Sequence, residues 1–187
     1  MERQILLIVL AILALGLAFN LHLSLAVMRR LRQERDSASA AAPRPGDAVA
    51  PVAARGLDAR AWAPLLPVGQ ACALLFLSSK CPKCTSHLPE LAAMLDEAAA
   101  AGLALRIASI EPAFRLRRFL AGTPLAAIAR RLRLRDYRLL NPQFTAPAYL
   151  FVDHDGTVQA AGLVGDADWQ GLREQLSGVA VVEVEAA

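Results

Sequence analysis

The sequence Cys81-Pro82-Lys83-Cys84 follows a short apolar run, residues 71–77, and precedes a stretch of strong helix formers, residues 85–101. This order predicts a buried strand that leads into a helix with two cysteines in its first turn. The unpaired N–H groups and the dipole at that end of a helix favour thiolate over thiol. Two cysteines in one helical turn can also close and reopen a disulfide. The motif therefore predicts thiol–disulfide chemistry.

The two cysteines are expected to have different roles. Cys81 lies at the helix start, so we expect it to be the accessible nucleophile. Cys84 lies one turn further, so we expect it to be buried and to resolve the mixed disulfide. Lys83 adds a cation that favours the Cys81 thiolate, and Pro82 removes a donor where a helix tolerates its loss. No separate cofactor is expected, because the Cys81–Cys84 disulfide is itself the redox group.

A metal site is the competing interpretation, because half of a zinc site has the same spacing. The chain has no second Cys-x-x-Cys. A metal-binding assembly factor would therefore use Cys81 and Cys84 with His87 or His154. The remaining cysteine, Cys72, begins the strand before the motif. We expect it to behave as a small buried hydrophobic residue, with a third redox thiol as the alternative.

Further strands are predicted after the motif. Residues 103–110 form a second apolar run. Residues 148–152 and 158–163 flank the turn sequence Asp153-His154-Asp155-Gly156, which predicts an antiparallel hairpin.

Helices are predicted between and after these strands. Residues 113–135 are expected to be helical in two pieces, separated at Gly122-Thr123-Pro124, and residues 166–176 to form a closing helix. The order strand, helix, strand, helix, strand, strand, helix predicts an α/β sandwich with a mixed central sheet.

The N-terminal part differs in composition from the rest. Residues 5–28 contain no charged side chain, which predicts one transmembrane helix after a short tail, residues 1–4. Residues 29–51 form a basic flank and a linker rich in Ala, Ser, Pro and Gly, and residues 52–187 form the remaining domain. A cleaved signal peptide is the alternative, but the nearest small-x-small site, Ala38-Ser39-Ala40, lies beyond four arginines.

The segment 113–135 holds seven arginines and no acidic residue. A solvated helix face is the simplest interpretation. The alternative is a docking surface for anionic lipid or an acidic partner. We expect no nucleic-acid partner, because no recognition motif accompanies the charge.

Two motifs together resemble the thioredoxin fold. One is the Cys-x-x-Cys at the start of a helix that contains Pro89, and the other is Thr145-Ala146-Pro147 just before the hairpin. The resemblance covers roughly residues 46–176 and implies that the domain, residues 52–187, is a thioredoxin-like α/β sandwich. It also implies a cis Ala146–Pro147 bond that lies against the disulfide.

Within this fold, the anchor and the Gly46-Asp47 pair resemble membrane-tethered thioredoxins of the TlpA/ResA group. Residues 153–164 are similar to the same region of the MauD family. These accessory proteins of methylamine utilisation are associated with disulfide formation in the small subunit of methylamine dehydrogenase. The resemblance implies a membrane-tethered thiol–disulfide oxidoreductase whose partner is a protein dithiol or disulfide. A general thioredoxin-like role in cytochrome c maturation is the alternative.

The side of the membrane is a conflict between two rules. Four arginines follow the span and only Arg3 precedes it, which favours a cytosolic domain. Disulfide exchange on folding clients belongs outside the cytosol, and the resemblance agrees. We therefore expect a single-pass protein of the inner (cytoplasmic) membrane whose domain faces the periplasm.

Overall fold

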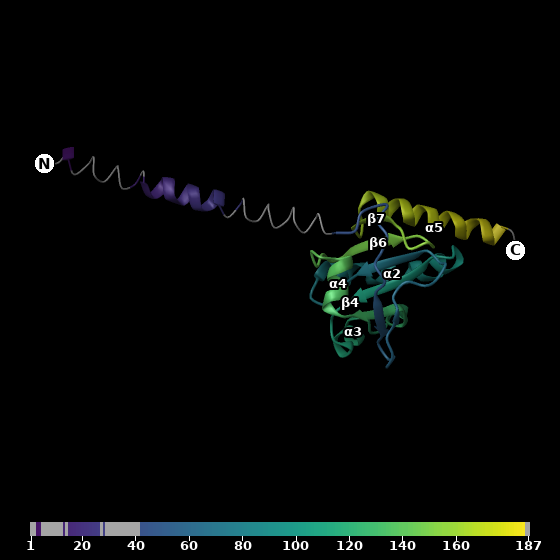
Figure 1. Cartoon of the computed structure of the whole chain (residues 1–187). Coiled ribbons are helices and arrows are strands. Elements are labelled where there is room, and N and C mark those ends of the chain that lie inside the picture. The colour runs from purple at the N-terminus through teal and green to yellow at the C-terminus, as the bar shows by residue number, and fades with distance from the viewer. Residues whose placement is uncertain (1–2, 5–12, 14, 27, 29–41, 186–187) are drawn as a thin grey trace. The chain divides into compact units, whose positions relative to one another are not determined.

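The computed structural model describes residues 3–4, 13, 15–26, 28 and 42–185 (Figure 1). The chain divides into two units, residues 1–41 and 42–187. In the first unit, residues 15–26 are helical and exposed. Much of the predicted anchor, residues 5–28, and most of the predicted linker lie outside the described residues. Within the described ranges, no helix combines the length and the apolar character that crossing a bilayer requires.

A seven-stranded mixed sheet forms the centre of the second unit, in the order β2-β1-β5-β4-β3-β6-β7. β3, β4 and β5 run parallel, whereas β6 pairs with β3, β7 with β6, β1 with β5 and β2 with β1 in antiparallel fashion. The strands are β1 (Ala53–Gly56), β2 (Ala63–Pro64), β3 (Cys72–Phe76), β4 (Ala104–Ser109), β5 (Ala129–Leu132), β6 (Ala148–Val152) and β7 (Val158–Leu163).

Helices cover both faces of this sheet. One core contains buried side chains of α2, α3, η1 and α5, and α2 packs against α5 (Figure 1). The opposite core contains side chains of α4 and of the segment before β3. The expected α/β sandwich with a mixed sheet is confirmed. The helices are α2 (Pro82–Ala100), α3 (Ala113–Phe119), the 3₁₀ helix η1 (Pro124–Ile128), α4 (Leu134–Leu140) and α5 (Ala167–Glu185).

β3 is buried on both faces, which explains its continuous apolar sequence. Leu75 faces the core that holds Cys84, whereas Cys72 and Leu74 face the opposite core. Cys72 is fully buried, and burial raises the pKa of its thiol to about 11. Cys72 and Cys84 therefore lie in different cores, so the structure supports a packing role for Cys72.

The prediction of two helical pieces over residues 113–135 is wrong in its second half. α3 and η1 occupy the first part, but Ala129–Leu132 forms strand β5 between β1 and β4. Ala129 is buried in the core that holds Cys84, and Leu132 is buried in the core on the other face of the sheet. Pairing with β1 and β4 therefore overrides the local helix preference. The strands β1 and β2 and the helix α4 were not predicted.

The folded unit also begins earlier than residue 52. The backbone N–H of Gly46 donates to Val158 at 2.8 Å, and that of Val49 donates to Gly156 at 2.9 Å. Ala48 forms an isolated antiparallel bridge with Thr157. The end of the predicted linker is therefore hydrogen-bonded to the hairpin turn and to the start of β7.

Candidate functional site

The site is built around the N-terminus of α2. Cys81 is the N-cap residue with an extended backbone, and Pro82 occupies the first turn. The N–H of Cys84 donates to Cys81 Sγ at 3.4 Å. Cys81 is half-buried and carries a free thiol. Lys83 is exposed on the same turn. The helix start therefore presents one partly exposed cysteine.

Cys84 lies beneath Cys81 and is fully buried. Burial raises the pKa of its thiol to about 12; the Ser78 backbone N–H, which donates to Cys84 Sγ at 3.5 Å, acts in the opposite direction. The Cys81 thiol and the Glu111 carboxylate raise this pKa further. Cys84 is therefore a thiol at neutral pH, which leaves the first attack on a client to Cys81.

The raised pKa of Cys84 makes stability depend on pH. Above about pH 8.5 an unfolded chain has lost this proton, whereas the folded reduced protein keeps it up to the folded pKa. The contribution of the Cys84 thiol to the free energy of unfolding is thus fully present below about pH 8.5 and is lost as the pH rises towards 12. We expect the free energy of unfolding to fall more steeply between pH 8 and 10 than in Cys84→Ala, by up to about 1.4 kcal/mol per pH unit. Urea titrations under reducing conditions measure both slopes; equal slopes would contradict the assignment.

A second loop lies against Cys81. The Ala146–Pro147 peptide bond is cis, as the resemblance implies. The Cys81 thiol donates to the Ala146 carbonyl oxygen at 3.4 Å. The loop thus places backbone groups beside the accessible sulfur, next to strand β6.

Asn141 holds this loop in place. Its side-chain amide nitrogen donates to the Thr145 carbonyl at 2.8 Å and to the Tyr137 hydroxyl at 3.1 Å. Its amide oxygen accepts from the Thr145 N–H at 3.0 Å. Asn141 is itself buried. One side chain therefore satisfies both backbone groups of Thr145, two residues before Pro147.

Removal of these bonds is expected to destabilise the protein. We expect Asn141→Ala to lower the free energy of unfolding by about 2 kcal/mol, because the part-buried backbone groups of Thr145 lose their partners and a buried side chain is removed. The matched control is Gln143→Ala, an exposed side chain in the same loop, with an effect within about 0.5 kcal/mol. Urea unfolding measures both. Equal losses would show that Asn141 does not hold the loop.

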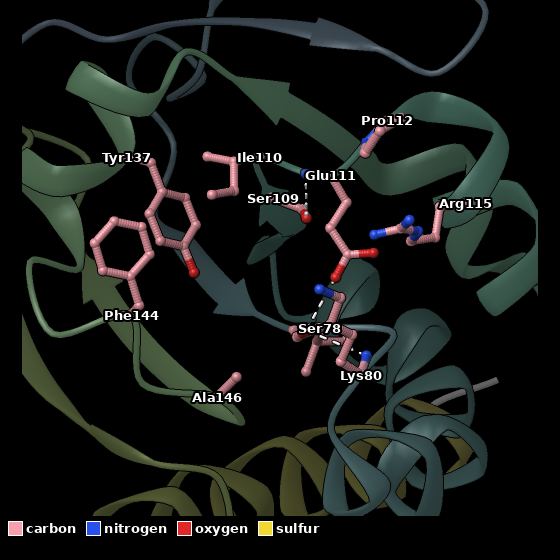
Figure 2. A pocket seen from close by; sticks show the side chains of 11 residues that line it. Ser78, Lys80, Ser109, Ile110, Glu111, Pro112, Arg115, Tyr137, Phe144 and Ala146 are labelled. Carbon is pink, nitrogen blue, oxygen red and sulfur yellow. Dashed lines mark hydrogen bonds between the residues drawn. The ribbon is translucent and has the colours of Figure 1, made fainter.

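A cavity of about 340 Å³ lies next to the turn before Cys81, where Ser78 and Lys80 line it (Figure 2). Tyr137 and Phe144 lie at one end of it, and Arg115 lies at the other, with Glu111 between them. Burial raises the pKa of Tyr137 to about 12, so its hydroxyl is neutral. The cavity also includes Ala146, so it adjoins the loop that contacts Cys81.

Glu111 ties the turn before Cys81 to the end of β4. Its carboxylate accepts from the Ser78 hydroxyl at 2.9 Å, from the Ser79 N–H at 2.9 Å and from the Ser79 hydroxyl at 2.5 Å. Ser78 in turn donates to Cys84. Sequence reasoning missed this residue. The signal was available, because β3 and β4 are parallel and their carboxyl ends meet at one edge of the sheet.

The arginines of segment 113–135 do not share one face. Six of the seven have a partner within the chain. Arg117 binds Asp58, Arg130 and Arg131 donate to carbonyl oxygens, Arg133 lies over Trp62, and Arg135 pairs with Asp136. Arg115 lies over the Phe114 ring, 6.0 Å from its centre, and also lines the cavity.

The histidines of the metal-ion hypothesis are engaged elsewhere. His87 Nδ1 lies 2.9 Å from Glu90 Oε2, and His154 lies in the hairpin turn beside Asp155. In the part of the chain that the structure describes, no three His, Cys, Asp or Glu side chains gather as metal ligands do.

Comparison with known proteins gives one family and many similar folds. The model of the AhpC/TSA family matches residues 65–161. No curated protein matches the chain. The chain is similar to a Chlorobium tepidum structure described as the thiol:disulfide interchange protein DsbE. The two are 20% identical with a TM-score of 0.62, over 74% of this chain and 99% of that one.

Two further structures have the same fold. The thioredoxin domain of a Bacteroides vulgatus thiol-disulfide oxidoreductase has a TM-score of 0.58 at 14% identity, over 71% of this chain and 98% of that one. A peroxiredoxin-like protein from Aquifex aeolicus has a TM-score of 0.57 at 15% identity, over 74% of this chain and 88% of that one. At these identities the structures establish the thioredoxin-like fold.

Proposed function

Because the chain belongs to the AhpC/TSA family of thioredoxin-like redox enzymes, we propose that it exchanges disulfides with protein clients through Cys81 and Cys84. One observation carries the proposal: two cysteines one turn apart differ in access, the first half-buried at a helix start and the second fully buried. A reactive dithiol needs this asymmetry, because one sulfur meets the client and the other completes the exchange.

The exchange proceeds in two steps. The Cys81 thiolate attacks one sulfur of a client disulfide, which forms a mixed disulfide and releases the other client sulfur as a thiolate. Cys84 then loses its proton and attacks Cys81 Sγ, which forms the Cys81–Cys84 disulfide and releases the second client thiolate. The client gains two electrons and the enzyme loses two. Client oxidation follows the same steps in reverse.

The loop before Pro147 supports the client in this scheme. The Ala146 carbonyl oxygen accepts from the Cys81 thiol in the reduced protein. In the mixed disulfide, the client sulfur replaces the proton on Cys81 Sγ, so the client backbone lies beside the same loop. Asn141 keeps this loop in position. The test is turnover: the purified protein should accelerate reduction of insulin disulfides by dithiothreitol.

The finer proposal is a MauD-like accessory role in maturation of methylamine dehydrogenase. The sequence of the hairpin, residues 153–164, supports it, together with the apolar stretch at residues 5–28. A general thioredoxin-like role in cytochrome c maturation is the second candidate, and the TlpA/ResA resemblance supports it. The identity of a covalently trapped client separates the two.

We further propose that residues 5–28 anchor the enzyme in the inner membrane with the catalytic domain in the periplasm. The absence of charge in that stretch and the chemistry on protein disulfides support this arrangement. The arginines after the span favour the opposite side. A membrane-impermeant thiol reagent should label Cys81 in intact, reduced spheroplasts; labelling only after lysis would place the domain in the cytosol.

A further inference from the structure

The surface around Cys81 carries an excess of cations. Lys80 and Lys83 flank Cys81 on either side and are exposed. Arg115, on α3, lines the neighbouring cavity (Figure 2). Arg138, on α4, is exposed and lies over Phe144 at the other end of that cavity. Two positive side chains therefore flank Cys81 in the sequence, and two more lie at the ends of the neighbouring cavity.

Glu111 is the single carboxylate among the residues that line the cavity. It is half-buried and already accepts three hydrogen bonds from Ser78 and Ser79. Arg115 has no carboxylate partner within ion-pair distance in the described part of the chain. A bound segment with negative charge would supply one.

The same cavity also offers apolar contact. Ile110 and Phe144 line it with 37% and 42% of their surfaces exposed, and Phe114 next to Arg115 is 68% exposed. Arg138 lies over the Phe144 ring, 5.7 Å from its centre. An apolar hollow with a cationic rim favours a peptide that has both an apolar and an acidic side chain.

We propose that the client segment is acidic, with Asp or Glu beside its reactive cysteine and an apolar residue that enters the cavity. This inference rests on the proposed function and names its substrate class. The Arg115 guanidinium selects the acidic side chain, and Lys80 and Lys83 raise the rate of encounter. Arg115 is the residue to change, because Lys80 and Lys83 adjoin Cys81 and alter its reactivity as well.

The test uses two synthetic peptides that share one phenylalanine and one intramolecular disulfide. Glutamates flank the disulfide in the first peptide, and lysines flank it in the second. The rate of reduction by the enzyme is divided by the rate for the same peptide with dithiothreitol. Both reagents attack as thiolates, so this ratio removes the effect that the flanking charges have on any thiolate. We expect the acidic peptide to react about ten-fold faster at low salt, and the ratio to fall at high salt.

Variants on one helix identify the residue responsible. Arg115→Gln should slow the acidic peptide about three-fold and leave the basic one unchanged or faster. The matched control, Arg118→Gln, removes an exposed arginine of α3 that does not line the cavity, and should leave both rates unchanged.

Three results would overturn the inference. Equal normalised rates would refute the acidic client and leave disulfide exchange intact. Absence of reaction with both peptides and with insulin would refute the proposed function itself. The third result combines two observations: the peptides react equally, and the protein binds phosphatidylglycerol vesicles in a salt-sensitive way that Arg115→Gln abolishes. This result would assign the surface to lipid.

Discussion

The Cys81→Ser protein is expected to lose disulfide exchange with insulin by at least about a thousand-fold. Cys81 is the cysteine that a client can reach, whereas Cys84 is fully buried and its raised pKa keeps it protonated. A serine hydroxyl at the helix start does not attack a disulfide at neutral pH. The change is small and half-exposed, so the fold should remain, and circular dichroism and urea unfolding check this.

The matched control for this variant is Cys72→Ala. Cys72 lies in the core on the opposite face of the sheet, so its removal should leave exchange near the level of the unmodified protein, with some loss of stability. Loss of exchange in Cys72→Ala at a temperature where it is folded would contradict the account, as would exchange that persists in Cys81→Ser.

The Cys84→Ser protein is expected to accumulate covalent mixed disulfides with its clients. Cys81 still attacks, but no second sulfur lies beneath it to release the client. The adducts should appear as higher bands on non-reducing gels, collapse on reduction, and be absent from Cys81→Ser/Cys84→Ser. If pre-reduced Cys84→Ser reduces one equivalent of insulin disulfide as fast and as completely as the unmodified protein without added thiol, the two roles are wrongly assigned.

Mass spectrometry of these adducts also identifies the client. The small subunit of methylamine dehydrogenase would support the MauD-like proposal, and apocytochrome c would support the alternative. Acidic residues beside the trapped cysteine would support the preference that Arg115 is proposed to create.

The motif and its surroundings were predictable because their signals are local. The run of apolar residues before Cys81 forms β3, and the helix formers after Cys84 form α2. The turn at residues 153–156 joins β6 and β7 because the Asp153 carboxylate accepts from the backbone N–H groups of Asp155 and Thr157. Short-range chemistry decides each of these elements.

The rest of the site depends on contacts between distant segments. Ala129–Leu132 has no strand pattern of its own, and it is a strand because β1 and β4 pair with it on both sides. Glu111 and Ser78 are 33 residues apart and meet only because β3 and β4 are parallel neighbours. The arginines of segment 113–135 read as one helix face, but the fold directs most of them to separate partners.

A redox titration of the reduced protein in glutathione buffers shows directly whether the helix start of α2 is the redox centre. Free thiols are alkylated at each potential and located by mass spectrometry. We predict one reversible two-electron transition in which Cys81 and Cys84 lose their thiols together while Cys72 stays reduced. Absence of a reversible transition, or a disulfide that includes Cys72, would contradict the claim that the helix start of α2 is the redox centre.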